Sequence, residues 1–515
     1  MLNLSVILED SARRFPSKTA YTFMDTSLSF AQINGAANQI ANGLQSIGIQ
    51  KGDKVAINCV NLPYFPMLYF GILKAGATVV PLSVLLKSKE IEFHLNDSDA
   101  KAVFAFVGTP ELPIGQETYA GFQNATKCEH FFMITPKPTD PSPIEGTKTL
   151  GMLMGGQAPQ FDAVMTSPDD TAVCIYTSGT TGRPKGAELT HSNIMLNTVL
   201  CADLAGVKTD DKVLIVLPMF HIFAMVVLMN TAIYRGASAV LLPRFDAEAV
   251  LGLMIQHKIT LFAGVPTMYW GLLNYNGDTF QPSQVKESLR VCLSGGASLP
   301  LQVLEEFEKI YEVPILEGYG MSEGSPVVTF NHLYQQRKPG SVGTPVWGVQ
   351  VKIIDDEGNE VPVGERGELV YKGHNVMKGY YNKPEANAKT IKDGWLHSGD
   401  VAIKDEDGYF YIVDRTKDMI IRGGFNVYPR EVEEVMIKHE AVSLVAVIGV
   451  PDDKMGEEIK ACVVLNEGYS ITEEELMAYT KNNIAAYKYP RMVEILNALP
   501  MSATGKILKK ELRKM

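Results

Sequence analysis

The stretch YTSGTTGRPKG, residues 176–186, holds three glycines, four threonine or serine hydroxyls and a lysine in eleven positions. The apolar run AVCIY (residues 172–176) is typical of a buried strand, and THSNIM (residues 190–195) is typical of a helix start. A loop that leaves a strand offers backbone N–H groups and hydroxyls to phosphate oxygens, and glycines permit close approach. We therefore predict a polyphosphate-binding loop, to which Lys185 adds a positive charge.

This loop has two other interpretations, a flexible surface loop and a Walker A loop. Three glycines alone are typical of a flexible surface loop. A Walker A loop requires Gly-Lys-Ser/Thr in that order, whereas Lys185 follows Pro184 and precedes Gly186. The Walker template therefore fails, and a phosphate-binding loop of a different kind remains.

Helix and strand patterns alternate through the first two hundred residues. Ser29 is placed to cap an amphipathic helix that ends at Gly48. The runs KVAINCV (residues 54–60) and TVVPL (residues 78–82) are typical of buried strands, with an apolar helix between them. Such alternation predicts layered α/β subdomains around a largely parallel sheet.

The length and the later pattern predict two domains. A chain of 515 residues is longer than one ordinary core supports. Residues 356–373 change to short strands with turn residues, and the pattern changes again after residues 407–415. We predict an α/β fold with a large N-terminal domain, residues 1–414, that ends in a β-rich patch. A small, mobile α+β C-terminal domain would follow, residues 415–515.

Composition excludes several classes of protein. Hydrophobic residues make up 46% and charged residues 20%, as in a soluble enzyme. The net charge of −11, without a basic stripe, argues against nucleic acid as a partner. Six scattered cysteines without CxxC spacing predict buried free thiols, no zinc site and a reducing, cytoplasmic compartment. Acids at Glu9 and Asp10 interrupt the first apolar run before it reaches signal-peptide length.

Residues 213–234 contain no Asp, Glu, Lys or Arg and are numerous enough to span a bilayer. Pro218, His221 and Asn230 interrupt the segment, and the chain on both sides alternates like a globular protein. These features favour a buried core helix over a membrane span.

Five further segments carry side chains suited to nucleotide chemistry. LSGGASLP follows a strand pattern, and open α/β sheets bind ligands at the carboxyl ends of strands. Tyr319 offers a stacking face, Ser322 a hydroxyl, and Glu323 a carboxylate for Mg²⁺. Each side chain alone has an ordinary structural explanation. The evidence for a nucleotide site is that all five segments occur together in this order. The segments are LSGGASLP (293–300), LEGYGMSE (316–323), WLHSGD (395–400), DRTKDMIIRGGFNVYP (414–429) and LPMSATGKILKKEL (499–512).

In this order the segments resemble the adenylate-forming superfamily of acyl-CoA synthetases, peptide-synthetase adenylation domains and beetle luciferases. The resemblance covers essentially the whole chain, and residues 176–186 are its most specific motif. LPMFHIFAM (217–225), LEGYGMSE and GGFNVYP (423–429) are most similar to bacterial long-chain fatty acid–CoA ligases. The resemblance implies two half-reactions. A carboxylate attacks the α-phosphate of Mg·ATP to give acyl-adenylate and pyrophosphate, and the thiol of CoA then displaces AMP.

The resemblance also assigns nucleotide-binding roles. Tyr319 would lie against adenine and Ser322 near the α-phosphate, while Asp400, assisted by Arg415, would bind the ribose hydroxyls. The nucleotide-binding residues implied in this way are Thr177, Ser178, Gly179, Thr180, Thr181, Gly182, Lys185, Gly295, Gly296, Ala297, Gly318, Tyr319, Gly320, Met321, Ser322, Asp400 and Arg415.

Chemical and conformational roles follow from the same resemblance. Lys506 would bridge the carboxylate and the α-phosphate, and Glu323 would bind Mg²⁺. Lys417 would be the hinge, and Gly423 and Gly424 would meet the pantetheine of CoA. An anionic carboxylate attacking an anionic phosphate accumulates negative charge, so a lysine stabilises the transition state more than the ground state.

The uncharged segment would form part of an acyl pocket. Each buried CH₂ of a fatty acyl chain contributes about 0.8 kcal/mol, so an apolar tunnel selects such chains. His221 is a third catalytic candidate: it would contact the carboxylate or gate the tunnel, or be a satisfied core histidine, and these alternatives stay open. The pocket residues implied are Phe220, His221, Phe223, Ala224, Val265 and Pro266.

Two positions depart from the common pattern of the superfamily. Ser322 stands where many members have threonine, which keeps the hydroxyl. Phe425 stands where many have glutamate, and fatty acid ligases often have phenylalanine there. The second departure favours a fatty acid substrate.

The predicted function is activation of a medium- or long-chain fatty acid to its CoA thioester, with fatty acid, ATP and CoA as small-molecule partners. The alternatives are a ligase for an aryl or other carboxylic acid, or one that loads an acyl carrier protein. Non-enzymatic alternatives are an inactive nucleotide sensor and an apolar-helix membrane protein. The sequence leaves the acyl chain length, peripheral membrane association and the oligomeric state open.

Overall fold

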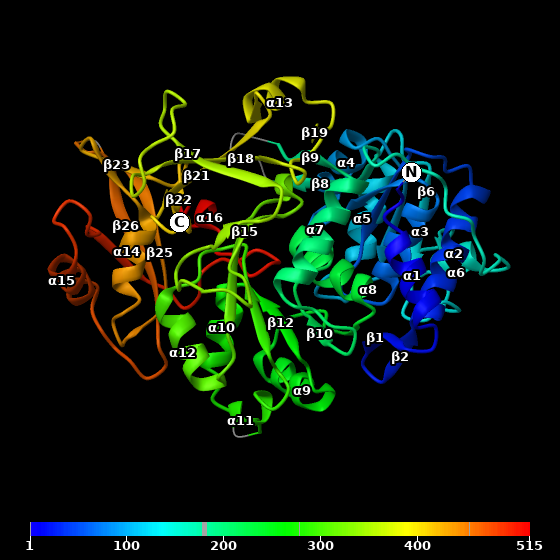
Figure 1. Cartoon of the computed structure of the whole chain (residues 1–515), viewed down its shortest axis with the longest axis horizontal. Coiled ribbons are helices and arrows are strands. Elements are labelled where there is room, and N and C mark those ends of the chain that lie inside the picture. Colours follow the sequence, from blue (N-terminus) through cyan, green and yellow to red (C-terminus); the bar gives the residue numbers. More distant parts are fainter. Residues whose placement is uncertain (1, 178–182, 278, 453) are drawn as a thin grey trace.

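The structure is a computed structural model that describes residues 2–177, 183–277, 279–452 and 454–515. Its strands form two large sheets and two smaller ones. In Figure 1 the two large sheets occupy the right and the centre of the view, coloured blue to green. The last hundred residues, coloured orange to red, lie at the left end.

The first large sheet contains the parallel strands that the alternating pattern predicts. Helix α2 (Phe30–Ser46) begins at the predicted cap, where the Ser29 hydroxyl accepts the N–H of Gln32 and the Gln32 side chain accepts the N–H of Ser29. In spatial order the strands are β19 (Gly379–Tyr380), β9 (Lys185–Thr190), β8 (Thr171–Thr177), β4 (Thr78–Pro81), β3 (Lys54–Asn58), β5 (Ala100–Phe106), β6 (His130–Ile134) and β7 (Lys148–Thr149).

Strand β9 is not apparent from the sequence. It pairs antiparallel with β8, with Thr177 opposite Lys185, and helix α7 (His191–Leu204) starts directly after it with Thr190 as its cap. The lysine, glycine and glutamate of β9 have low strand propensity, so its conformation depends on pairing with β8 and β19. The helix predicted after Gly186 is confirmed, but a strand precedes it.

The second large sheet has a parallel centre, in which β11, β10, β12, β13 and β14 pair in that order. Antiparallel strands extend it at both edges. In spatial order the strands are β16 (Thr344–Pro345), β15 (Val327–Phe330), β14 (Ile315–Gly320), β13 (Val291–Ser294), β12 (Leu261–Gly264), β10 (Lys212–Ile215), β11 (Ser238–Leu241), β1 (Thr19–Phe23) and β2 (Thr26–Ser29).

The β-rich patch predicted near residue 360 is the third sheet, and the fourth sheet belongs to the last hundred residues. The third sheet contains β17 (Val349–Ile354), β18 (Gly367–Gly373), β21 (Trp395–Lys404), β20 (Ile391–Lys392) and β22 (Phe410–Arg415). The fourth contains β24 (Phe425–Val427), β23 (Ile420–Arg422), β26 (Gly456–Leu465), β25 (Val442–Asp452) and β27 (Met492–Ile495).

The uncharged segment is buried, as predicted, but it is not one helix. Strand β10 occupies its start, a loop carries His221, and a π-helix η1 (Phe223–Asn230) leads into α8 (Thr231–Arg235). In the described ranges no helix is long and apolar enough to cross a membrane.

The remaining helices cover the sheets or connect their strands. They are α1 (Val6–Arg14), α3 (Tyr64–Lys74), α4 (Ser88–Asp97), α5 (Ile114–Gln123), α6 (Leu150–Met154), α9 (Ala247–His257), α10 (Pro266–Leu273), α11 (Pro282–Val285), α12 (Leu301–Tyr311), η2 (Ser322–Gly324), α13 (Pro384–Thr390), α14 (Pro429–Met436), α15 (Glu473–Asn483) and α16 (Lys509–Leu512).

The apolar core is divided at the boundary between the third and fourth sheets. One large cluster runs from Leu4 to Phe410 and joins both large sheets to the third. Two separate clusters, which begin at Ile420 and end at Leu512, lie within the fourth sheet and its helices. All six cysteines are buried and free, which confirms the prediction of unpaired thiols.

Candidate active site

Four neighbouring strands of the second large sheet end at one edge. β10, β12, β13 and β14 pair in parallel, so their carboxyl ends meet there. The chain that leaves these strands carries His221, Val265, Gly295 and the motif of residues 319–323. Predicted site residues from four distant parts of the sequence are therefore brought to one place.

A buried hydrogen-bond network joins this edge to the third sheet. The Tyr319 hydroxyl donates to Oδ2 of Asp400 at 2.5 Å. Asp400 of β21 lies opposite Arg415 of β22, whose Nε is 3.2 Å from Oδ1 of Asp400. Burial and the neighbouring carboxylate raise the pKa of Tyr319, so its hydroxyl stays protonated. The three residues implied for adenine and ribose binding thus form one oriented group.

Glu323 is the second oriented acid of the site. It is buried on the short helix η2, and its Oε1 accepts hydrogen bonds from Thr177 Oγ1 at 3.0 Å and from the Tyr380 hydroxyl at 2.8 Å. Tyr380 of β19 was missed by sequence reasoning, because nothing in its neighbourhood distinguishes it from a core tyrosine. The hydrogen bond from Thr177 places the end of β8 beside Glu323, the predicted magnesium ligand.

The signature loop is described only at its two ends. Ser178, Gly179, Thr180, Thr181 and Gly182 lie outside the described ranges. Lys185, at the start of β9, holds its Nζ 4.2 Å from the centre of the Tyr380 ring. Tyr380 therefore contacts both Lys185 and Glu323, the cation and the acid that flank this loop.

The glycines of the predicted nucleotide site have different structural reasons. Gly296 has φ +80, and a side chain there would point toward Val265 and Lys506. A Cβ on Gly318 would lie 2.3 Å from the Phe330 ring, and one on Gly320 would lie 2.0 Å from a main-chain carbonyl. The packing of β14 on β15 therefore requires Gly318 and Gly320, whatever they contact in a ligand.

The other residues implied for the nucleotide line the same edge. Ala297 is exposed in the loop after β13. Met321 and Ser322 are half-buried between β14 and η2. The side chains of these residues are accessible to a ligand at the strand ends.

Lys506 is brought to this edge by a turn from the last segment of the chain. Gly505 has φ +77, a backbone region that favours glycine. Its carbonyl accepts a 2.9 Å hydrogen bond from Thr267 Oγ1 of α10. The Cε of Lys506 lies 4.0 Å from the position of a Cβ on Gly296. The predicted catalytic lysine thus lies against the loop predicted to border the nucleotide.

The charge of Lys506 depends on its surroundings. Burial lowers its pKa to about 8, and the positive charge of Arg415 acts in the same direction. Asp400 opposes this shift, while Lys417 adds to it. The lysine is therefore largely protonated at neutral pH and poorly hydrated, which strengthens its interaction with an anion.

The predicted acyl wall is apolar and adjoins the same edge. Phe220, Ala224 and Val265 are buried, and the ring of Phe223 lies 3.4 Å from the position of a Cβ on Gly295. Pro266 is the first residue of helix α10. His221 is the one polar side chain implied in this wall.

His221 precedes η1, and its Nδ1 accepts the N–H of Phe223 at 3.3 Å. Burial lowers the pKa of His221 to about 4, and Lys506 lowers it further by charge repulsion. The imidazole is therefore neutral at physiological pH, and its Nδ1 already has a partner. This fits a polar contact or a core residue better than a general acid.

Two family models match the chain. The model described as AMP-binding enzyme matches residues 8–381, and the AMP-binding enzyme C-terminal domain matches residues 431–506. This chain belongs to the AMP-binding enzyme family.

Full-length relatives of this AMP-binding enzyme are ligases. A long-chain-fatty-acid–CoA ligase of Bacillus subtilis (strain 168) is 40% identical, covering 99% of this chain and 94% of the relative. A feruloyl-CoA synthase of an Amycolatopsis species is 37% identical, covering 98% and 97%. The solved structure of a benzoate CoA ligase from Burkholderia xenovorans LB400 has a TM-score of 0.90 at 27% identity and covers 100% of both chains. The chain is an adenylate-forming acid–thiol ligase.

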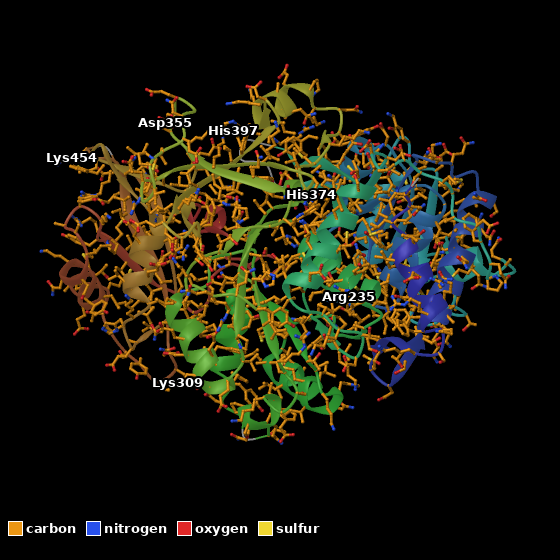
Figure 2. All side chains as sticks on the ribbon, viewed as in Figure 1. Arg235, Lys309, Asp355, His374, His397 and Lys454 are labelled. Atoms are coloured by element: carbon orange, nitrogen blue, oxygen red, sulfur yellow. The ribbon has the colours of Figure 1, made fainter. Side chains whose placement is uncertain are left out.

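The predicted CoA-binding turn of this AMP-binding enzyme lies elsewhere. Gly423 and Gly424 are exposed between β23 and β24, and the N–H of Gly423 donates to the carbonyl of Met455 at 2.8 Å. Figure 2 shows Lys454, which follows β25 of the same sheet, at the outer margin of the molecule. Lys417, the predicted hinge, is exposed between β22 and β23. A Cβ on Gly423 or Gly424 would meet no described residue of the predicted active site within 4 Å, whereas Lys417 is near enough for its charge to lower the pKa of Lys506.

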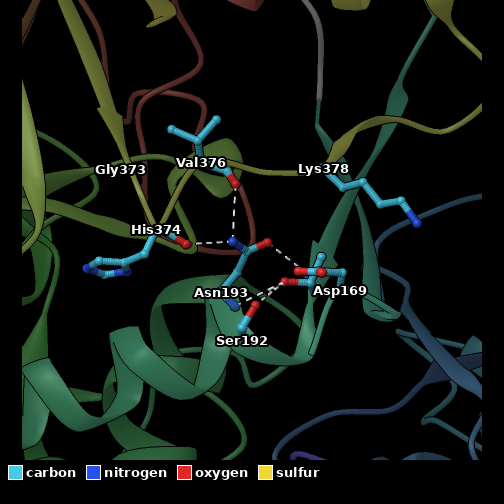
Figure 3. Close-up of a pocket in the computed structure, with 8 residues that line it drawn as sticks. Asp169, Ser192, Asn193, Gly373, His374, Val376 and Lys378 are labelled. Atoms are coloured by element: carbon cyan, nitrogen blue, oxygen red, sulfur yellow. Dashed lines mark hydrogen bonds between the residues drawn. The ribbon is translucent and has the colours of Figure 1, made fainter. Parts of the chain in front are cut away.

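A cavity of about 370 Å³ lies between the start of α7 and the end of β18 (Figure 3). The Asn193 side-chain amide crosses it and donates to the carbonyls of His374 and Val376, at 2.6 and 3.2 Å. Ser192, Lys378 and Asp169 complete its polar lining. At this cavity helix α7 is hydrogen-bonded to the segment that follows β18. None of the described residues implied for ATP, acid or CoA binding lines the cavity.

Proposed function

We propose that this acid–thiol ligase activates medium- or long-chain fatty acids with ATP and transfers the acyl group to CoA. The observation that carries the proposal is the position of Lys506, held against Gly296 at the strand edge that also carries Tyr319 and Glu323. This arrangement suits attack of a carboxylate on a nucleotide α-phosphate.

In the first half-reaction a carboxylate oxygen attacks the α-phosphorus of ATP. The bond from that phosphorus to the bridging oxygen breaks, and pyrophosphate leaves. Asp400 and Tyr319 would orient the ribose and adenine, while the protonated Lys506 would stabilise charge on the carboxylate and the α-phosphate. The packed position of Lys506 means that little reorganisation is needed during the step.

The residues present fit a magnesium ion held together with the phosphates of ATP. Among the described residues, the Glu323 carboxylate accepts its two hydrogen bonds on Oε1, so Oε2 could bind a ligand. In the described residues no cluster of three or more His, Cys, Asp or Glu could hold a metal by itself. Mg²⁺ is commonly bound by one or two carboxylates with substrate phosphates, and there it would neutralise phosphate charge.

The second half-reaction requires a different arrangement of the small domain. The CoA sulfur attacks the acyl carbonyl carbon, and the bond to the AMP oxygen breaks. We propose that a large domain, residues 1–414, and a small domain, residues 415–515, change their relative orientation at Lys417. The separate apolar cores on the two sides of this boundary support such a motion. Gly423 and Gly424 would then reach the acyl-adenylate.

The apolar acyl wall and the relative from Bacillus subtilis favour an aliphatic acid. An aryl acid is the second candidate, because one relative is named for feruloyl-CoA and one structural neighbour for benzoate. Phe223 beside Gly295 would suit stacking on an aromatic ring as well as contact with an alkyl chain.

Pyrophosphate release tests the proposal directly. The enzyme is incubated with Mg·ATP and CoA and with straight-chain acids of increasing length or with benzoate and ferulate. We expect kcat/KM to rise with chain length into the medium or long range, and acyl-CoA to form with AMP. A clear preference for the aryl acids would overturn the fatty acid assignment. Accumulation of acyl-adenylate without thioester would overturn CoA as the acceptor.

A further inference from the structure

We propose that Arg430 is a positioning residue that holds the small domain in the orientation that places Lys506 at the active site. The inference rests on the proposed role of Lys506 in adenylation. It assigns a role to a residue that touches neither the nucleotide site nor the acyl wall.

Arg430 connects three segments at the start of helix α14. Its Nη1 donates to Ser298 Oγ at 3.0 Å, in the loop after β13, and also to the carbonyl of Ile412. Its N–H donates to Oδ2 of Asp414 at 3.1 Å. Because Ser298 follows the Gly295–Ala297 turn directly, Arg430 ties the small domain to the loop that Lys506 faces.

A buried acid of the large domain, Glu317, lies within the electrostatic influence of Arg430. Glu317 of β14 is 5% exposed and accepts the N–H of Gly340 at 3.2 Å. Burial raises the pKa of Glu317 to about 7, and the charge of Arg430 is the largest influence that opposes this rise. The backbone of Leu299 also favours the carboxylate, whereas Glu308 of α12 disfavours it. Moving Arg430 away would therefore remove the charge that most favours the ionised form of Glu317, so this buried acid would either stay charged at a cost or take up a proton.

A second contact between the same two parts of the chain is weaker and serves as a comparison. Glu431, the next residue of α14, pairs with Arg366 at 2.5 Å and with Lys488. The Arg366 side chain is 40% exposed, compared with 18% for Arg430. Exposed ion pairs contribute little, so Arg366 should matter less than Arg430.

The test measures the two half-reactions separately in Arg430→Ala, Arg430→Lys and Arg366→Ala. Adenylation is followed as pyrophosphate release without CoA, and thioester formation starts from synthetic acyl-adenylate and CoA. We expect Arg430→Ala to lower kcat for adenylation at least about tenfold with little change in KM for ATP. Thioester formation should be unchanged or faster. Arg430→Lys should restore part of the adenylation rate, and Arg366→Ala should lose about threefold or less.

Glu317→Gln separates positioning from a general loss of structure. Removing the buried charge should lower adenylation severalfold in the wild-type background, because the neutral amide attracts Arg430 less. In the Arg430→Ala background the same change should restore part of the lost rate, because no unpaired acid remains. Arg491→Ala is the control for folding: Arg491 bonds to the carbonyls of Tyr489 and Ala486 within the small domain.

Three outcomes would overturn the inference: equal loss of both half-reactions in Arg430→Ala, full activity of that variant, or effects of Arg430→Ala and Glu317→Gln that simply add. A wild-type enzyme without acid-dependent pyrophosphate release would instead defeat the proposed function. The two failures are therefore distinguishable in one set of assays.

Discussion

Two glycine turns of the small domain have nearly the same backbone and opposite surroundings. Gly505 has φ +77 and Gly424 has φ +83. A Cβ on Gly505 would lie 3.0 Å from both Thr267 Oγ1 and a methyl of Val265, whereas a Cβ on Gly424 would meet nothing within 4 Å. The local shape of a turn therefore does not decide its use. The orientation of the domain decides which turn contacts the large domain, and here it is the turn that carries Lys506.

The residues beside the two turns show the same contrast. Lys506 lies in a poorly hydrated environment, where burial lowers its pKa to about 8. Phe425, beside Gly424, is 57% exposed, and its ring is tilted by 32° to the ring of Tyr487, with ring centres 5.0 Å apart. An exposed phenylalanine beside a glycine pair is what a surface would present if it becomes covered in a second orientation.

Removing the charge of Lys506 should have the largest effect on the rate of adenylation. Lys506→Ala should slow acyl-adenylate formation by about 10²–10³-fold, comparable to loss of an oxyanion-hole donor. Thioester formation from synthetic acyl-adenylate and CoA should stay close to the wild-type rate, because the proposed domain motion would carry Lys506 away. Equal damage to both steps would show that the turn at Gly505 does not alternate with the turn at Gly424.

Stiffening the proposed hinge should have the converse effect. In Lys417→Pro the ring fixes φ near −65°, so we expect thioester formation to fall on the order of tenfold or more. Adenylation should survive, because its arrangement is already present. Rapid-quench assays measure the ratio of the thioester-forming rate to the adenylation rate. Lys417→Ala is the control for loss of the side chain. An unchanged ratio in the proline variant would remove Lys417 as the hinge.

The pH dependence should differ between the two steps. Protonated Lys506 dominates below its pKa of about 8 and is lost as the pH rises above it. We expect the adenylation rate to fall by about tenfold per pH unit above this value, and the thioester step to lack this titration. Lys506→Arg, which stays charged, should abolish the decline even if its absolute rate is lower. A decline that persists in this variant would assign the titration to another group.

The smallest effects should come from adding one methyl group to each turn. Both Gly505→Ala and Gly424→Ala place a side chain in the left-handed region, which costs about 1 kcal/mol in stability. Only Gly505→Ala also meets close neighbours, so it alone should slow adenylation, by about fivefold to tenfold. Thermal unfolding and pyrophosphate release measure the two effects. Similar adenylation rates in the two variants would mean that the Gly505 turn is not firmly docked.

Much of the framework was predictable from local pattern. Ser29 and Gly48 mark a helix, the apolar runs before residues 177 and 295 are strands, and Gly505 predicts the turn before Lys506. These features depend on capping, periodicity and glycine conformation, which act over a few residues. The order of the motifs was sufficient to indicate the family, and the family models confirm it.

Other features depend on contacts between distant parts of the chain. Strand β9 exists because β8 and β19 pair with it, and η1 is a π-helix inside a segment without charged residues. Tyr380 becomes a site residue only because β19 brings its hydroxyl to Glu323. Nothing in a local window distinguishes these residues from ordinary core or surface positions.

The sequence by itself determined which side chains are available: those of a loop predicted to bind phosphate, a tyrosine, two acids, and a lysine with two glycine turns on the last hundred residues. Only the tertiary structure decided that the Gly505 turn contacts Thr267 while the Gly424 turn stays exposed. It also decided that Arg430 bonds to Ser298 and that its charge favours the ionised form of the buried Glu317. The reason is physical: turn conformation is set by neighbours in the chain, but burial, charge pairing and domain orientation are set by residues hundreds of positions away.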